Sequence, residues 1–80
     1  MGKSRQANYN RLLQRVLREA RTEAGLTQEE VAVRLGFPQS FVSKYETGER
    51  RLNLGELRDI CEVLGVSLLD VVRKIETGAL

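Results

Sequence analysis

The amino-acid sequence predicts an all-α domain built from five short helices. In several stretches apolar residues recur at steps of three and four, which is the period of a helix with one buried face. Glycines and helix-capping residues divide the 80-residue chain into pieces of helix length. No stretch shows the strict alternation of apolar and polar residues that predicts a half-buried strand. These observations predict one small α-helical domain with a modest core.

The first helix is expected over residues 8–24. Its inward side chains fall at helical spacing and are Leu13, Val16, Leu17, Ala20 and Ala24. Gly25 follows, at a position where glycine commonly ends a helix. Residues 1–8 are polar and basic and precede the apolar pattern, so we expect a flexible N-terminal arm there. The folded domain is then expected over residues 9–76, with a C-terminal tail at 77–80.

The second helix is expected to begin after Thr27 and to be very short. The Thr27 hydroxyl can accept a hydrogen bond from the first turn, and Glu30, three residues on, completes a capping box. The inward side chains are expected to be Val31, Ala32 and Leu35. Gly36 suits the left-handed corner that follows.

The third helix is expected over residues 38–47. Pro38 suits its first turn, because the fixed φ of proline is helical and its missing N–H has no partner there in any case. Gly48 closes the helix. Its inward residues are expected to be Val42 with Tyr45 or Glu46.

Two further helices are expected over residues 54–65 and 68–76, capped by Asn53 and Ser67. The apolar stripe of the first of these consists of Leu54, Leu57, Ile60, Cys61 and Leu64. Cys61 is expected to be a small buried apolar residue, because a lone cysteine has no intrachain disulfide partner.

Composition narrows the classes of function. No apolar run approaches the roughly 20 residues that span a bilayer, so we expect a soluble, cytoplasmic protein with no membrane partner. With no histidine and one cysteine, no metal or other cofactor is expected. No nucleophile stands beside a base, so no enzyme is expected, and no feature indicates a small-molecule ligand.

Charge is distributed unevenly along the chain. The net charge is +2, yet residues 1–21 hold six basic residues and one acidic residue, whereas residues 22–80 hold seven basic and ten acidic residues. This asymmetry suggests an end that faces a polyanion, although a basic run is also typical of a solvated face.

The middle of the chain resembles a DNA-binding motif. The stretch "LTQEEVAVRLGFPQSFVSKYETGERRLNLGELRDICEVLGV" resembles the helix-turn-helix of the phage repressor and Cro family, or XRE family. The matching positions are Gln28, Ala32, Gly36, Val42, Glu46 and Gly48. The resemblance covers about residues 9–75, with the helix-turn-helix at about 28–47. It implies a compact five-helix lambda-repressor-like fold that binds double-stranded DNA.

The third helix is expected to read bases, because the second helix of such a pair enters the major groove with its N-terminal part. The residues that point away from the inward Val42 are Gln39, Ser40, Ser43 and Lys44, and none of them is acidic. Glutamine can pair with adenine, lysine with guanine and serine with either. We expect Gln39, Ser40 and Lys44 to read bases, with Ser43 next; without the motif they would be an ordinary polar face.

Phosphate contacts are expected around the motif. The resemblance implies that Gln28 binds a backbone phosphate with its side chain and the first amides of its helix. Arg50 and Arg51 lie in the loop that passes along the next phosphate in relatives. Arg11 and Arg15 are weaker candidates, because the first helix is expected near DNA only at its start.

Glu46 is expected to have a structural role. A carboxylate at the end of a DNA-reading helix would repel phosphate, but relatives hold this acid against an arginine of the first helix, which aligns with Arg21. The resemblance therefore implies a structural Arg21–Glu46 ion pair. Phe37 is expected to cover the corner as core. Phe41 either packs on the second helix, which we favour, or touches a thymine methyl.

A homodimer is expected, because one such module buries little DNA surface and relatives bind palindromic half-sites as twofold dimers. The apolar band of the fifth helix is wider than one core contact requires and consists of Leu68, Leu69, Val71, Val72 and Ile75. We expect this band to form the dimer surface, joined by Leu64 and Val66. The alternative is that all five are core residues of a small bundle.

The expected function is a sequence-specific DNA-binding transcriptional regulator, a repressor or an operon controller, acting on a palindromic operator. The alternative is an antitoxin-like or other partner-binding protein with DNA-binding autoregulation. A purely structural bundle is a third interpretation, and the polar outward face of the third helix argues against it.

Overall fold

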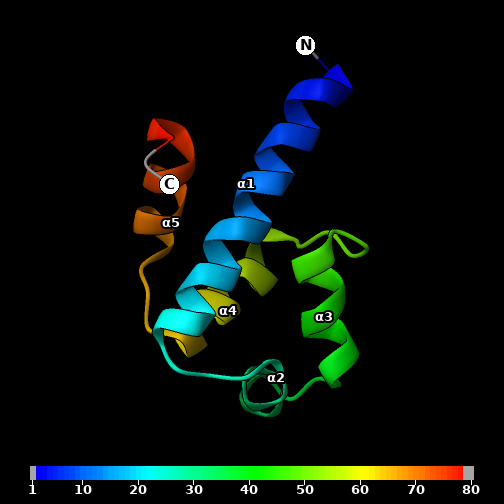
Figure 1. Cartoon of the computed structure of the whole chain (residues 1–80), viewed down its shortest axis with the longest axis vertical. Coiled ribbons are helices and arrows are strands. Elements are labelled where there is room, and N and C mark those ends of the chain that lie inside the picture. The colour runs from blue at the N-terminus through cyan, green and yellow to red at the C-terminus, as the bar shows by residue number, and fades with distance from the viewer. Residues whose placement is uncertain (1, 79–80) are drawn as a thin grey trace.

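The computed structural model describes residues 2–78, with side chains from residue 5 onward, and confirms the all-α prediction. Its helices are α1 (Gly2–Glu23), α2 (Gln28–Leu35), α3 (Gln39–Thr47), α4 (Leu54–Leu64) and α5 (Leu68–Thr77). Figure 1 shows α1 as a long rod with α5 along one side, α3 on the other and α2 near its C-terminal end. Residues 2–78 contain no strand. Within the described part of the chain, no helix combines the length and the apolar character that crossing a membrane requires.

α1 begins earlier than predicted. It starts at Gly2 rather than at about residue 8, so the part of the predicted arm that the structure describes is helical. Gln6 and Ala7 are good helix formers, but they add nothing to the apolar pattern on which the prediction rested. At the other end of the chain, α5 stops at Thr77 and Gly78 follows as its cap. Met1 and residues 79–80 of the predicted tail lie outside the described residues.

The predicted capping signals set the starts of three helices. The Thr27 hydroxyl accepts a hydrogen bond from the Glu30 N–H at 3.1 Å, and the Thr27 N–H donates to Glu30 Oε1 at 2.8 Å, so the predicted capping box is confirmed. Asn53 forms a second box with Glu56 at the start of α4. Ser67 caps α5 through a hydrogen bond from the backbone of the first turn. Each cap satisfies backbone N–H groups that have no partner inside the helix.

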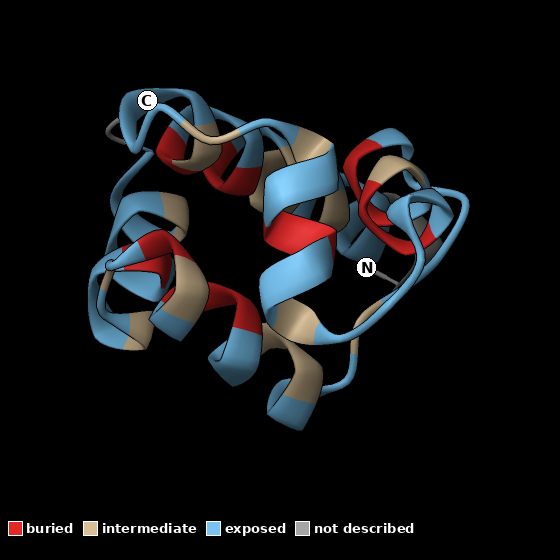
Figure 2. Ribbon diagram, turned by 90° about the horizontal axis from the view of Figure 1, so that it is seen from below, coloured by how far each residue is buried: buried red, intermediate tan, exposed pale blue. Residues whose placement is uncertain are grey.

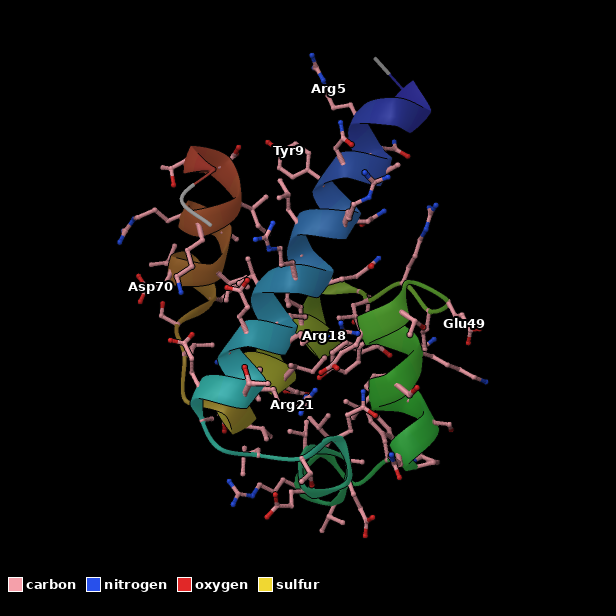
Figure 3. All side chains as sticks on the ribbon, in the orientation of Figure 1. Arg5, Tyr9, Arg18, Arg21, Glu49 and Asp70 are labelled. Carbon is pink, nitrogen blue, oxygen red and sulfur yellow. The ribbon has the colours of Figure 1, made fainter. Side chains whose placement is uncertain are left out.

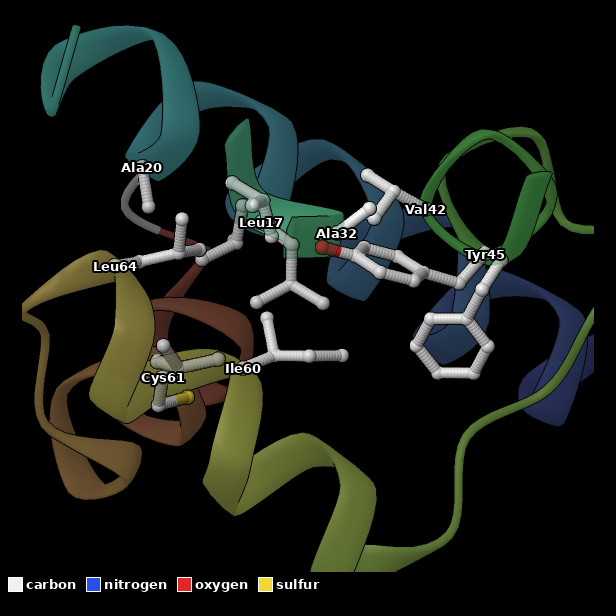
Figure 4. Close-up of a cluster of buried hydrophobic side chains, with 12 residues drawn as sticks. Leu17, Ala20, Ala32, Val42, Tyr45, Ile60, Cys61 and Leu64 are labelled. Carbon is white, nitrogen blue, oxygen red and sulfur yellow. The ribbon is translucent and has the colours of Figure 1, made fainter. Parts of the chain in front are cut away.

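All five helices contribute to one core. Figure 2 marks the buried residues along the helices, and Figure 4 shows the Tyr45 ring among buried aliphatic side chains that include Leu17, Ala32 and Val42. The buried apolar residues are Val16, Leu17, Ala20, Val31, Ala32, Phe41, Val42, Tyr45, Ile60, Cys61, Leu64 and Val71. Cys61 is therefore a buried apolar residue, as predicted.

Five assignments of apolar residues were wrong. Ala24 and Leu54, expected to face inward on the first and fourth helices, are exposed. Val71 and Leu64 are 2% and 5% exposed, so they belong to the core and are not available for a dimer surface. Val71 faces inward together with the half-buried Leu68 and Ile75. Leu68 lies three residues before it and Ile75 four residues after it, a spacing that places all three on one face of the helix. Phe37, expected in the core, is 45% exposed. Its ring lies against Phe41, which is buried by packing, the alternative that we favoured.

Candidate nucleic-acid interface

The corner between α2 and α3 is fixed by its backbone. Gly36 adopts the left-handed conformation, with φ 78° and ψ 26°, which glycine reaches without Cβ strain. The Phe37 N–H then donates to the Ala32 carbonyl at 3.0 Å and closes the end of α2. Ala32 and Val42 are 2% and 0% exposed, so a small and a medium side chain fill the crossing of the two helices. The corner therefore holds α3 at a defined angle, with its opposite face outward.

The outward face of α3 carries the predicted base-reading residues. Gln39, Ser40 and Lys44 are exposed, and Ser43 is half-buried. Val42 and Tyr45, on the opposite face, are 0% and 2% exposed. Among the described side chains, no ion pair engages Lys44. The face is thus polar, open to solvent and without a carboxylate.

Glu46 lies on the buried side of α3 and is held by two other helices. Arg21 donates to it twice, from Nε to Oε2 at 2.7 Å and from Nη2 to Oε1 at 3.1 Å. Gln28 Nε2 donates to Oε1 at 3.0 Å, and Arg18 Nε lies 3.6 Å from the same oxygen. Figure 3 shows Arg18 and Arg21 on the C-terminal half of α1. The structure thus contains the predicted Arg21–Glu46 pair within a larger cluster.

The electrostatics of the cluster favour the charged pair. The Glu46 side chain is 0% exposed and the Arg21 side chain 14% exposed, so little solvent screens their attraction. The hydrogen bond to Glu46 raises the pKa of Arg21 above its ordinary value, against the opposing effect of burial. Arg21 also donates to the Leu26 carbonyl at 3.0 Å, which ties the α1–α2 connection to the same group. The carboxylate therefore joins α1, α2 and α3.

Two members of this cluster were missed by sequence reasoning. Arg18 lies three residues before Arg21, a spacing that places both on one face of α1, and that spacing could have indicated it. The hydrogen bond from Gln28 to Glu46 joins residues 18 positions apart and has no local signal. Gln28 is half-buried, and its amide nitrogen has a second hydrogen besides the one donated to Glu46. This second hydrogen and the backbone N–H groups of Gln28 and Glu29 have no partner among the described residues, whereas the Glu30 N–H is held by Thr27.

The loop between α3 and α4 gives its two arginines different surroundings. Arg50 forms an ion pair with Glu56, and its guanidinium carbon lies 4.9 Å from the centre of the Phe41 ring. Arg51 is exposed and takes part in no ion pair among the described side chains. Both arginines were predicted to contact phosphate, whereas the structure pairs Arg50 with a carboxylate. Glu56 was missed, although the spacing Asn53-x-x-Glu56 is the pattern of a capping box.

A hollow of about 290 Å³ separates α1 from this loop and brings Arg11 together with Arg50 and Arg51. Its lining includes the buried Leu17 and Tyr45. Arg15 is not part of this lining. It pairs with Glu19 at 3.2 Å, and since the two side chains are 62% and 49% exposed, the pair stabilises α1 only weakly.

The predicted dimer band on α5 is divided by the fold. Leu69 and Val72 are 73% and 43% exposed, whereas Leu68 and Ile75 are half-buried and pack against the core. Tyr9 of α1, labelled in Figure 3, donates a hydrogen bond to Glu76 and so ties α5 to α1. The apolar surface that α5 leaves open is therefore the pair Leu69 and Val72.

Comparison with known proteins agrees with this geometry. Over 52 residues the chain is 44% identical to the HTH-type transcriptional regulator y4dJ of Sinorhizobium fredii, a match that covers 65% of this chain and 68% of that protein. An XRE-family like protein from Pseudomonas syringae pv. tomato superposes with a TM-score of 0.83 and 46% identity, over 95% of this chain and 92% of that chain. The clp gene regulator ClgR from Corynebacterium glutamicum has a TM-score of 0.79 and 26% identity, over 86% of this chain and 88% of that chain. The helix-turn-helix family model matches residues 17–71, more than half of the chain. This chain therefore belongs to the helix-turn-helix family, of the XRE/Cro-C1 type.

Proposed function

We propose that this chain is a sequence-specific, double-stranded-DNA-binding transcriptional regulator, a repressor or operon controller, that places α3 in the major groove. One observation carries the proposal: the outward face of α3 is polar and free of acids, while the single acid of the helix, Glu46, is buried against Arg21. Lys44 is then the only charge that α3 presents outward, and its sign suits a polyanion. The regulators that this chain resembles support the same function.

Base contacts are assigned to the exposed start and middle of α3. Gln39 suits adenine, Lys44 suits guanine and Ser40 suits either base. Ser43 is half-buried, so it comes after these three. Loss of a base contact at Gln39 or Lys44 is expected to change the preference among sites by about 1–3 kcal/mol.

Phosphate contacts are assigned to Gln28, Arg51 and Arg11. Arg51 and Arg11 line one hollow, so both can approach the same stretch of backbone, and the N-terminal amides of α2 support Gln28. Arg50 contributes less charge to this surface because Glu56 neutralises it. Arg15, paired with Glu19 and outside the hollow, is the weakest member of the set.

The test is selection from a pool of random-sequence duplexes, followed by fluorescence anisotropy on an enriched duplex at several salt concentrations. We expect one sequence family to be enriched, and log affinity to fall linearly with log salt with a slope of about −0.9 per neutralised phosphate. Lys44→Ala should alter the preferred sequence, whereas Arg51→Ala should weaken every sequence alike. A pool that shows no enrichment, or binding that is insensitive to salt, would refute the proposal.

We further propose that the regulator is a homodimer through Leu69 and Val72 and binds palindromic half-sites about one helical turn apart. Light scattering after size exclusion is expected to give twice the chain mass for the parent and the single-chain mass for Leu69→Glu. Val33→Glu is the matched control, because Val33 on α2 is also 73% exposed. If the parent is a monomer both when free in solution and when bound to DNA, the dimer proposal is contradicted. A stable complex with a neighbouring gene product, lost in Leu69→Glu, would favour the antitoxin-like alternative instead.

A further inference from the structure

Phe37 is an exposed aromatic residue at the entrance to the proposed reading helix. The residue is 45% exposed, although phenylalanine is among the residues most often buried. It directly precedes Pro38, the N-cap of α3. Its backbone position is fixed, because the left-handed Gly36 precedes it and its own N–H donates to the Ala32 carbonyl at 3.0 Å. The corner therefore directs the ring to the surface at the N-terminal end of α3.

The exposed ring rests on packed groups. The Phe37 and Phe41 ring centres lie 4.6 Å apart, with the ring planes tilted by 47°. Phe41 in turn meets Tyr45 edge to face at 5.6 Å, and Arg50 lies over the Phe41 ring at 4.9 Å. These contacts restrict the Phe37 ring, so it has little rotational freedom to lose when its open side meets a partner.

The position of Phe37 favours a contact with DNA over a contact with another protein. Gln39 and Ser40, the first residues of α3, are exposed and able to pair with bases, and Phe37 lies two and three residues before them at the same end of the helix. The apolar group that the major groove displays is the C5 methyl of thymine, and phenylalanine is one of the side chains that contact it. Of the other exposed large apolar residues, Leu54, Leu69 and Val72 lie on α4 and α5, while Tyr9 and Val33 lie on α1 and α2, outside α3.

Building on the proposed function, we infer that Phe37 is a specificity-determining residue that covers the C5 methyl of one thymine in each half-site. Hydrogen bonds from α3 and an apolar contact from Phe37 then select adjacent features of the same A·T-containing sequence. Burial of one methyl group contributes enough free energy for a preference of about fourfold over a base that lacks the methyl.

The experiment uses a duplex selected by the full chain, in which each thymine is replaced in turn by deoxyuridine. Deoxyuridine lacks the C5 methyl but keeps every hydrogen-bonding group of thymine, and the parent protein is unchanged in this comparison. We expect the parent to lose affinity about fourfold at one thymine of each half-site. Phe37→Ala should bind the thymine and uracil duplexes equally at that position, whereas Val33→Ala, at a more exposed apolar site on α2, should keep the full preference.

The outcomes separate this inference from the proposed function. If no duplex is enriched, the proposed function fails and the role of Phe37 fails with it. If a duplex is enriched but uracil is tolerated at every position, or if Phe37→Ala keeps the full preference for thymine, the assignment of Phe37 alone is overturned. Phe37→Leu, which keeps an apolar side chain against Phe41, should retain part of the preference and provides a second variant if the alanine variant unfolds.

Discussion

Replacing Glu46 with alanine is expected to remove a large part of the stability of this domain. The change leaves the Arg21 guanidinium, which is 14% exposed, without its carboxylate partner. Breaking a buried pair from one side costs about 3–5 kcal/mol. We expect a value near the lower limit, about 3 kcal/mol, because Arg21 keeps its hydrogen bond to the Leu26 carbonyl. At roughly 0.05–0.15 kcal/mol per residue, a domain of this length has a total stability of only about 4–12 kcal/mol.

The assay is urea and thermal unfolding at pH 7, followed by far-ultraviolet circular dichroism. A loss near 3 kcal/mol lowers the Tm by roughly 12–24 °C in a domain of this size. Glu49→Ala is the control, because this acid is exposed in the next loop and should change stability by less than about 0.5 kcal/mol. Replacing both partners, as Arg21→Met with Glu46→Leu, should recover much of the loss, since neither charge is then left buried. Equal melting temperatures for Glu46→Ala and the parent would refute the reasoning.

Tyr45, Cys61 and the two arginines of the α3–α4 loop allow further tests of the fold and site. Tyr45→Phe should stabilise the protein by about 1 kcal/mol, because the buried Tyr45 hydroxyl has no hydrogen-bond partner among the described residues. Burial raises the pKa of Tyr45 above its ordinary value of 10.0. The parent should therefore lose stability as the pH rises above that value, because there the tyrosine ionises in the unfolded chain but not in the folded one. Urea unfolding at pH 8 and above pH 10 should show a smaller loss of stability for Tyr45→Phe than for the parent, and an equal loss contradicts this. Burial also raises the pKa of the Cys61 thiol, so a disulfide reagent should modify it far more slowly in the native protein than in urea, and equal rates would show that the thiol is accessible. Arg51→Ala should reduce the salt slope of DNA binding by about 0.9 and have little effect on stability. Arg50→Ala should lower stability and change the slope less, because Arg50 pairs with Glu56. The reverse pattern would make Arg50 the phosphate contact and Arg51 the structural residue.

Local signals were sufficient to predict most of the fold. Thr27 with Glu30, and Asn53 ahead of α4, are capping residues whose hydrogen bonds join groups three residues apart, so the sequence itself contains both partners. Gly36 and Gly48 indicated helix ends for a second local reason: both adopt a positive φ that other residues avoid. The start of α1 was missed because its first turns have no apolar face and no capping residue, which leaves nothing periodic to detect.

The site was harder to predict because its decisive contacts are not local. The Arg21–Glu46 pair spans 25 residues and was expected only through the family resemblance. Arg50 was expected to face a phosphate, but its contacts with Glu56 and Phe41 depend on how the loop folds back over α3 and α4. Phe37 was placed in the core because large apolar residues beside a helix corner are commonly buried there. The exposure of an aromatic ring depends on which helices pack around it, and the residues next to Phe37 in the sequence do not determine that packing.

The position of Glu46 also limits how changes within the cluster can act on DNA binding. One carboxylate holds Arg21 of α1 and Gln28 of α2 while belonging to α3, so it fixes the orientation of α3 without facing the outward surface. Its removal should therefore reduce DNA affinity through the fraction of folded molecules and through the position of Gln28, and leave the preferred bases unchanged. Binding measured well below the melting temperature separates these effects, because there the folded fraction is close to one. A preferred sequence that changes with Glu46→Ala under those conditions would place the acid within reach of the bases, contrary to its burial.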